Sequence, residues 1–393
     1  MYEPGYPVTK KANHVIPFVT WNLEAVAKEF VIMKVLILGS GKIGSLISCL
    51  LVQSGDYFVH LADSDSNAIQ RAKSETTHSN FRAVCLDAQK RSELAKYLME
   101  NSQDAIISAL PYYCNPLVAD LAREFGLYYF DLTEDVEVTR SVKKVSAGAS
   151  TAFIPQCGLA PGFISIVANE LMTHFENLDT VKLRVGALPV NPNNVLKYSL
   201  TWSTDGLINE YGNLCYGVEN GAAAVLLPLE GYETIEVDGL LYEAFNTSGG
   251  LGTLADSYAG KVHTMNYKTL RYPGHCEKIQ FLIQDLKLNQ DRPTLKRILE
   301  NAIPKTLQDV VLIYASVMGK KGGELYEETY VKKIYPQMIA GRLWSAIQVT
   351  TAAGLCAVAD LVLQNPKGYN GFVTQESFSF SRFLANRFGQ YYK

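Results

Sequence analysis

The chain has 393 residues and a formal net charge of −3 at pH 7, and it is 48% hydrophobic and 19% charged. This balance is typical of globular proteins and excludes a largely disordered chain. The sequence contains no run of Lys and Arg, so it predicts no nucleic-acid partner. The length is sufficient for two domains with separate cores.

The cysteines and the apolar segments indicate the compartment. Seven cysteines are scattered without any Cys-x-x-Cys pair, so we expect reduced thiols, no disulfide framework and no bound metal. No apolar run approaches the ~20 residues of a membrane span, and we therefore expect no membrane partner. These features predict a cytoplasmic protein.

Residues 1–32 are interpreted as an N-terminal extension, either a leader or a misplaced start, because Met33 directly precedes the first expected strand. Glu24, Lys28 and Glu29 interrupt the apolar stretch of this extension, which excludes a secretory signal.

A short apolar strand over residues 34–38 continues into a Gly-x-Gly-x-x-Gly turn and then a helix. Gly39 permits the tight turn, Gly41 lets the backbone approach a pyrophosphate, and Gly44 lets the helix pack closely on its strand. The free N–H groups of the helix N-terminus suit phosphates. The residues assigned to cofactor binding in this turn are Gly39, Ser40, Gly41, Lys42, Ile43 and Gly44.

The second strand, 58–63, ends in Asp63, nineteen residues beyond Gly44. A carboxylate at this spacing accepts hydrogen bonds from a ribose 2′-hydroxyl and repels a 2′-phosphate. No arginine follows it directly, so the sequence predicts NAD as the cofactor in preference to NADP.

Strands and helices continue to alternate, which predicts an α/β protein with a Rossmann-like doubly wound parallel sheet over residues 33–158. The further strands are expected at 81–87, 105–110, 128–131 and 152–155, and the helices at 92–99, 116–125 and 136–147. Ligands bind at the carboxyl ends of such strands. The segments at these ends are Leu110-Pro-Tyr-Tyr113, Asp131-Leu-Thr-Glu-Asp135 and Gln156-Cys-Gly158, and Asp87, Leu110 and Pro111 are assigned to cofactor binding.

After Pro161 the pattern changes to an inserted α+β domain with a mainly antiparallel sheet, over residues 159–340. We expect it to begin with a helix opening on Pro161. Residues 341–393 are expected to return to the first domain, through a long helix of small residues over 341–363. The expected strands of the second domain are 181–185, 196–202, 233–237, 262–268, 309–315 and 324–330, and the helices are 276–286 and 294–303.

Several segments outside the glycine turn resemble the saccharopine dehydrogenase family, and most closely its lysine 6-dehydrogenase-like branch. These segments are 157–162, 185–189, 198–206 and 269–275, and the resemblance covers about residues 33–375. It implies NAD(P)-linked oxidation at a carbon–nitrogen bond of a lysine-derived amino acid. It also implies a homodimer formed through the inserted domain, which supplies part of the substrate site.

Asp205 departs from the arginine that enzymes acting on saccharopine tend to carry in this turn. An aspartate suits an ammonium group, whereas an arginine suits the extra dicarboxylate arm of saccharopine. The sequence thus favours lysine or a similar diamine acid, with a saccharopine or carboxynorspermidine-type enzyme as the alternative. Asp205 could equally cap the following helix. For the protein as a whole, a non-catalytic dinucleotide sensor is a further alternative.

The remaining candidates are weighed against structural roles. Arg271 is assigned to the substrate carboxylate or to an ion pair, since its fork pairs bidentately with carboxylates. His275 and Asp131 are candidate general bases, although either could be structural. Tyr112, a catalytic candidate, and Tyr113, a substrate-binding one, are expected beside the nicotinamide, unless they belong to the core. Cys157 is interpreted as a packing thiol.

Overall fold

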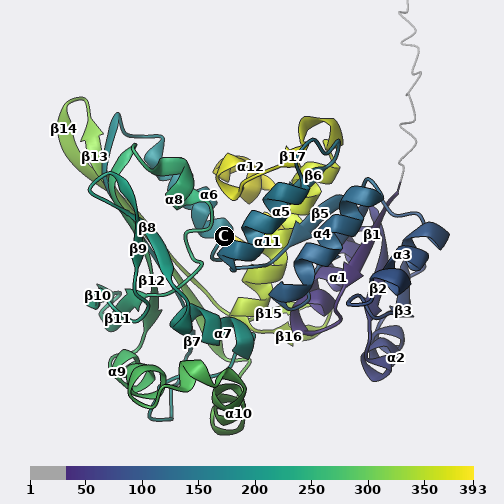
Figure 1. The fold of residues 1–393 in the computed structure, drawn as a ribbon, viewed down its shortest axis with the longest axis horizontal. Coiled ribbons are helices and arrows are strands. Elements are labelled where there is room, and N and C mark those ends of the chain that lie inside the picture. Colours follow the sequence, from purple (N-terminus) through teal and green to yellow (C-terminus); the bar gives the residue numbers. More distant parts are fainter. Residues whose placement is uncertain (1–31) are drawn as a thin grey trace, which may run out of the picture. The chain divides into compact units, whose positions relative to one another are not determined.

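The computed structural model describes residues 32–393, so the expected N-terminal extension lies, except for Ile32, outside the described residues. The described part contains two large sheets and one two-stranded sheet (Figure 1). The first is parallel, the second is mixed, and the fold is α/β as expected.

The first sheet has seven strands in the order β17-β6-β5-β4-β1-β2-β3, all parallel. The strands are β1 (Met33–Leu38), β2 (Tyr57–Asp63), β3 (Phe81–Cys85), β4 (Ala105–Ser108), β5 (Tyr128–Asp131), β6 (Ala152–Ile154) and β17 (Gly371–Phe372). The helices between them are α1 (Lys42–Ser54), α2 (Ser66–Glu75), α3 (Arg91–Glu100), α4 (Asn115–Glu124) and α5 (Val136–Val145).

Both faces of this sheet are buried, which explains why β1 is a continuous apolar run rather than an alternating one. Val35 and Ile37 pack on one face with α1 and a C-terminal helix, α11 (Ala346–Leu363). Leu36 and Leu38 pack on the other face with α3, α4 and α5. The strand order reverses between β1 and β4, and ligands of such sheets bind beside that point.

The second sheet has eight strands. They are β7 (Asn177–Pro189), β8 (Cys215–Glu219), β9 (Ala222–Leu226), β10 (Glu233–Val237), β11 (Leu240–Asn246), β12 (Val262–Arg271), β13 (Asp309–Lys321) and β14 (Glu324–Ile334). Pairing is antiparallel except between β12 and β7. The associated helices are α6 (Phe163–Met172), α7 (Thr204–Gly212), α8 (Leu254–Tyr258), α9 (His275–Gln280) and α10 (Arg292–Ala302).

The strand expected at 196–202 does not form. The backbone N–H of Tyr198 binds the side chain of Asn194, and that of Leu200 binds the carbonyl of Pro304. Tyr198 and Leu200 are nevertheless buried, in the cluster that joins α7, α9 and α10. The apolar alternation here reflects packing of a loop beneath helices, which period-2 reasoning cannot distinguish from a strand.

The helix expected from residue 341 begins later. Residues 337–344 form a small hairpin, β15 (Gln337–Ile339) and β16 (Arg342–Trp344). Ser345 then starts α11 through a capping box with Gln348. Helix α6 likewise begins at Phe163, two residues after the expected proline.

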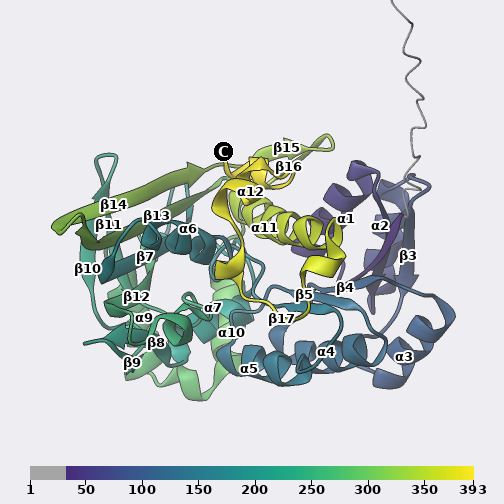
Figure 2. The same cartoon turned by 90° about the horizontal axis from the view of Figure 1, so that it is seen from above.

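Helix α11 packs against α1 (Figure 2), and β17 adds the edge strand beside β6 (Figure 1). The last helix is α12 (Phe380–Ala385). By length and composition α11 could span a membrane, but 89% of it is buried inside the protein, as in the core helix of a soluble fold. It is the one such helix found in residues 32–393.

Candidate functional site

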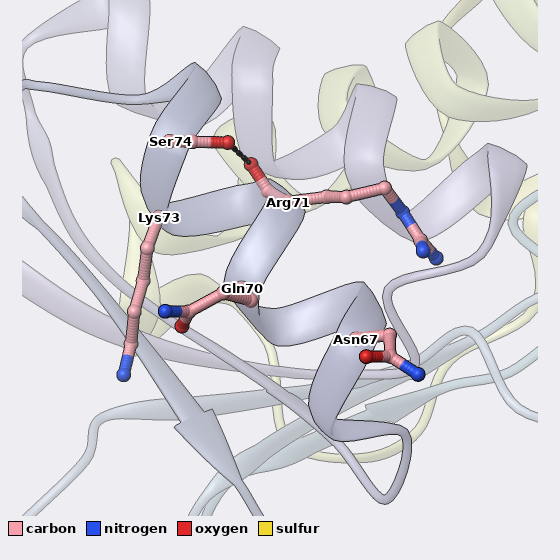
Figure 3. A pocket seen from close by; sticks show the side chains of 5 residues that line it. All are labelled: Asn67, Gln70, Arg71, Lys73 and Ser74. Carbon is pink, nitrogen blue, oxygen red and sulfur yellow. Dashed lines mark hydrogen bonds between the residues drawn. The ribbon is translucent and has the colours of Figure 1, made fainter.

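Two open hollows lie on the first domain, beside α2 and β3. The larger, about 660 Å³, is lined by a single helix, α2. Figure 3 shows its side chains, in which the hydroxyl of Ser74 donates to the carbonyl of Arg71 within the helix. Because one element supplies every lining residue, this hollow offers little convergent chemistry.

A more enclosed cavity of about 500 Å³ lies at the carboxyl ends of the first sheet, with α7, β7 and β12 forming its far wall. Its position is the one expected for ligands of a doubly wound sheet. The sequence-predicted residues that line it are Gly41, Lys42, Ile43, Leu110, Pro111, Tyr112, Asp205 and Arg271. Tyr113, by contrast, is 57% exposed and is not part of the lining.

The geometry of the glycine turn fits a dinucleotide. Gly39 has φ +97°, and a Cβ there would lie 2.8 Å from the carbonyl oxygen of Ala109. A Cβ on Gly44 would lie 1.9 Å from the carbonyl oxygen of Gly39. A Cβ on Gly41, however, would meet nothing within 4 Å, so the turn leaves open space at this position. No side chain caps α1, whose first N–H groups are therefore available to phosphate.

Asp63 holds this turn in place. Its Oδ2 accepts hydrogen bonds from the backbone N–H of Ser40 at 2.7 Å and from the Ser40 hydroxyl at 2.9 Å. Asp63 is half-buried at the end of β2, beside the turn. Asp87, the other predicted acid, accepts from the N–H of Gln89 and lies 3.6 Å from the Lys90 ammonium, outside the cavity lining.

Arg271 is 3% exposed at the end of β12, and its side chain is already heavily engaged. Its Nε donates to the Tyr211 hydroxyl, Nη1 donates to Thr269 and to the carbonyl of Leu270, and Nη2 donates to Glu210 at 3.3 Å. One of the five N–H groups of the guanidinium is thus left for a ligand. The bidentate grip on a substrate carboxylate, expected from the sequence, requires displacement of Glu210.

His275 supports Arg271 from behind rather than facing the cavity. Its Nδ1 lies 2.8 Å from the carbonyl of Leu196, so Nδ1 carries the proton and Nε2 accepts from Tyr211 at 3.0 Å. Burial and the nearby Arg271 lower the pKa of His275 to about 3. The imidazole is neutral, 1% exposed and outside the cavity lining, so this arrangement gives it a structural role in place of the expected basic one.

Asp131 is also placed away from the cavity. The side chain is fully buried and accepts hydrogen bonds from the Tyr129 hydroxyl and from the backbone N–H groups of Thr133 and Gln156. Burial raises the pKa of this carboxyl. Because the Asp131 carboxyl is fully buried outside the cavity lining, the structure gives it a structural role in place of the expected basic one, and Asp135 caps α5. The Asp131 carboxylate instead shapes the loop after β5.

Asp205 lines the cavity, but its charge is shared. Its carboxylate lies 2.7 Å from the Lys296 ammonium, and the Asp205 side chain is 44% exposed. The cap of α7 is Ser203, whose hydroxyl accepts from the N–H of Gly206, so the capping alternative for Asp205 is wrong. The ion pair weakens the preference for an ammonium group that the aspartate alone would create.

Two half-buried glutamates of the cavity wall, Glu134 and Glu210, were not assigned a role from the sequence. Glu134 follows β5, and Glu210 lies on α7 beside Arg271. Burial raises the pKa of each carboxyl to about 7, against the opposing effect of Arg271 on Glu210. The position of Glu134 just past a parallel strand was the available signal. No local pattern marks Glu210.

Within residues 32–393 no group of three or more His, Cys, Asp or Glu side chains is arranged to hold a metal ion. Cys157 is buried, and its thiol contacts the carbonyl of Ile154. Burial raises the pKa of this thiol well above its usual value, which suits a packing thiol.

Family comparison matches residues 35–152 to the saccharopine dehydrogenase NADP binding domain and residues 158–388 to the saccharopine dehydrogenase C-terminal domain. Among curated relatives, mitochondrial alpha-aminoadipic semialdehyde synthase of Mus musculus is 24% identical over 269 residues, which cover 66% of this chain and 29% of the relative. The Bos taurus protein of the same name is 22% identical over 313 residues, covering 77% and 33%. The chain therefore spans about a third of the length of these relatives.

Among solved structures, apo saccharopine dehydrogenase (L-Glu forming) from Saccharomyces cerevisiae matches with a TM-score of 0.72 and 18% identity, over 90% of this chain and 96% of that one. At this identity the likeness shows that the two proteins share a fold.

Proposed function

Because the chain belongs to the saccharopine dehydrogenase family, we propose that it is an oxidoreductase that acts on a carbon–nitrogen bond of lysine or a lysine-derived amino acid. The observation that carries this proposal is that one cavity joins the glycine turn to the ion pair between buried Arg271 and half-buried Glu210. A cofactor site and a site for a charged amino acid thus share one space, as hydride transfer requires.

The family match and the glycine turn indicate a nicotinamide dinucleotide cofactor, which supplies the hydride acceptor when bound. The N-terminus of α1 would hold its pyrophosphate, and Pro111 and Tyr112 would form the cavity wall beside its nicotinamide end. We further propose NAD in preference to NADP, because Asp63 places a carboxylate at the end of β2 beside the turn.

The chain's own side chains would bind and orient the amino acid. The remaining N–H of Arg271 suits an α-carboxylate. The Thr201 hydroxyl lines the cavity, is buried and has no hydrogen-bond partner in the described part of the chain, so it fits a polar group of the substrate.

We propose lysine as the preferred substrate, because the carboxylate of Glu134 lines the cavity without a cationic partner among residues 32–393 and suits an amine, and Asp205 adds a carboxylate that it shares with Lys296. Saccharopine is the second candidate, since Lys42 and Lys305 also line the cavity and suit its additional carboxylates. A homodimer formed through the second domain and a cytoplasmic location complete the proposal. Exposed Leu325, Tyr326 and Val331 on the edge strand β14 support the dimer, because such edges pair readily.

The test measures kcat/KM of the purified chain for lysine and for saccharopine, each with NAD and with NADP, at the absorbance band of the reduced nicotinamide. Turnover of either amino acid supports the proposed activity, and a higher value for lysine supports the substrate preference. A clear preference for saccharopine overturns the lysine assignment. Cofactor binding with no oxidation of either amine overturns the enzymatic proposal and favours a dinucleotide sensor.

A further inference from the structure

The loop after β5 presents one acid to the cavity. Asp131 anchors its start by accepting the Thr133 N–H at 2.9 Å, and the Thr133 hydroxyl accepts the Asp135 N–H at 3.1 Å. Asp135 then caps α5. Glu134 lies between these two fixed points and lines the cavity, one strand away from the β4 loop that carries Pro111 and Tyr112.

Two glycines of the second domain approach Glu134 closely. A Cβ on Gly206, at the start of α7, would lie 2.8 Å from the Glu134 Oε1 atom. A Cβ on Gly249, whose φ is +90°, would lie 2.4 Å from the Glu134 carbonyl oxygen. The absence of a side chain at Gly206 therefore leaves room for the Glu134 carboxylate, and its absence at Gly249 leaves room for the Glu134 backbone.

The other acids of the cavity wall are either engaged or exposed. Glu210 binds Arg271, Asp205 binds Lys296, and Glu300 is exposed. In residues 32–393 no other side chain forms a hydrogen bond or ion pair with the Glu134 carboxylate. Among these acids, Glu134 thus combines partial burial with a carboxylate that no other side chain of the described residues engages.

We propose that Glu134 is the group that accepts the proton of the substrate nitrogen before hydride transfer. This inference rests on the proposed function and holds for a primary amine or a secondary one. The substrate ammonium first loses H⁺ to the carboxylate, which becomes a carboxylic acid. The neutral amine then loses hydride from its carbon to the nicotinamide, and the nitrogen lone pair forms the C=N bond of an iminium. Glu134 later releases its proton to water, so charge and electrons balance.

The electrostatics of the site suit this transfer. Burial, together with the smaller effects of the charges of Glu210, Asp135 and Asp131, raises the pKa of Glu134 to about 7, against the lowering effect of a hydrogen bond from its own backbone N–H. Two other acids of the cavity wall are paired: Glu210 forms an ion pair with the Arg271 guanidinium on β12, and Asp205 forms one with the Lys296 ammonium. A lysine-type amine has a pKa of about 10.4. The raised pKa of Glu134 therefore reduces the pKa difference between the substrate ammonium and the carboxyl from about 6 to about 3 units, which makes the proton transfer less unfavourable.

The test compares Glu134→Gln with the parent chain and with Glu137→Gln as a matched control. Glu137 lies three residues away, is 74% exposed and pairs only with Arg140 among the described residues, so its loss should leave activity unchanged. Melting temperature and NADH binding verify folding and cofactor binding. The pH profile of kcat/KM is the decisive readout, because a merely structural residue would not move it.

We expect kcat/KM of the parent and of Glu137→Gln to rise with pH through an inflection near 7, as Glu134 loses its proton. Glu134→Gln should lose this inflection and 10²-fold or more in kcat/KM, while Glu134→Asp keeps the inflection and part of the rate. A Glu134→Gln protein that binds NADH and keeps the parental profile overturns the inference while the proposed function stands. A parent chain that oxidises neither amine overturns both.

Discussion

Replacement of Asp131 by alanine tests whether this carboxylate supports the fold or takes part in the reaction. The side chain is fully buried and accepts three hydrogen bonds, at 2.6 Å from the Tyr129 hydroxyl, 2.9 Å from the Thr133 N–H and 3.1 Å from the Gln156 N–H. Alanine leaves all three donors buried without an acceptor. Each such donor costs about 1–3 kcal/mol.

The same substitution removes a buried charge, whose desolvation is the reason that the pKa of Asp131 is raised. The gain from removing that charge offsets part of the loss of three acceptors. We therefore expect Asp131→Ala to lower the free energy of unfolding by about 2–4 kcal/mol. Asp131→Asn keeps a carbonyl oxygen for the two backbone donors, and its NH₂ can donate to the Tyr129 oxygen, so the expected loss is about 1–2 kcal/mol.

Urea unfolding followed by tryptophan fluorescence measures both losses, and turnover of the folded variants measures the catalytic effect. The control is Asp120→Ala, because Asp120 is 54% exposed and forms a surface ion pair with Arg91, so its loss should cost less than about 1 kcal/mol. Asp131→Asn should keep turnover within a few fold of the parent. Parental stability combined with a hundredfold loss of turnover in Asp131→Asn would refute the structural interpretation of Asp131.

Three further predictions concern the cofactor, the substrate and pH. Asp63→Ser should weaken NAD binding tenfold or more and reduce the affinity difference between NAD and NADP, because it removes the carboxylate that binds Ser40. Calorimetric titration of both cofactors checks this, and tighter binding of NADP than of NAD by the parent chain would contradict it. Arg271→Lys should lower kcat/KM tenfold or more with unchanged NADH affinity, because a lysine ammonium cannot reproduce the four hydrogen bonds that the guanidinium donates. Unchanged substrate kinetics would show that Arg271 is structural. Because burial lowers the pKa of His275 below its unfolded value of 6.5, its contribution to stability is present above pH 6.5 and is lost as the pH falls toward 3. Urea titrations of the parent and of His275→Gln should therefore diverge less at pH 5 than at pH 8, and equal divergence at both would show that His275 titrates normally.

The first domain could be predicted from the sequence because the residues that define its turn and strands lie close together in the chain. The glycine turn requires a positive φ at Gly39 and a close approach at Gly44, and both demands are visible as residue types at fixed spacing. The apolar runs of the parallel strands likewise reveal burial on both faces. The segments at 157–162, 185–189, 198–206 and 269–275 were sufficient to identify the family.

Period-2 alternation was less reliable in the second domain. It indicates burial of every second residue but does not say what covers them. At 196–202 the alternating side chains pack beneath helices, and the backbone hydrogen bonds go to Asn194 and Pro304 rather than to a neighbouring strand.

Only the tertiary structure decided which polar side chains face the cavity. A residue just past a strand can point into the cavity or into the core, and the loop backbone decides which. Asp131 points into the core and binds its own loop, whereas Glu134, three residues on, reaches the cavity. Glu210 and Arg271 meet across sixty-one positions of sequence, and no local pattern records that contact. Local residue chemistry therefore identified the dinucleotide turn, while long-range packing selected the acids beside it.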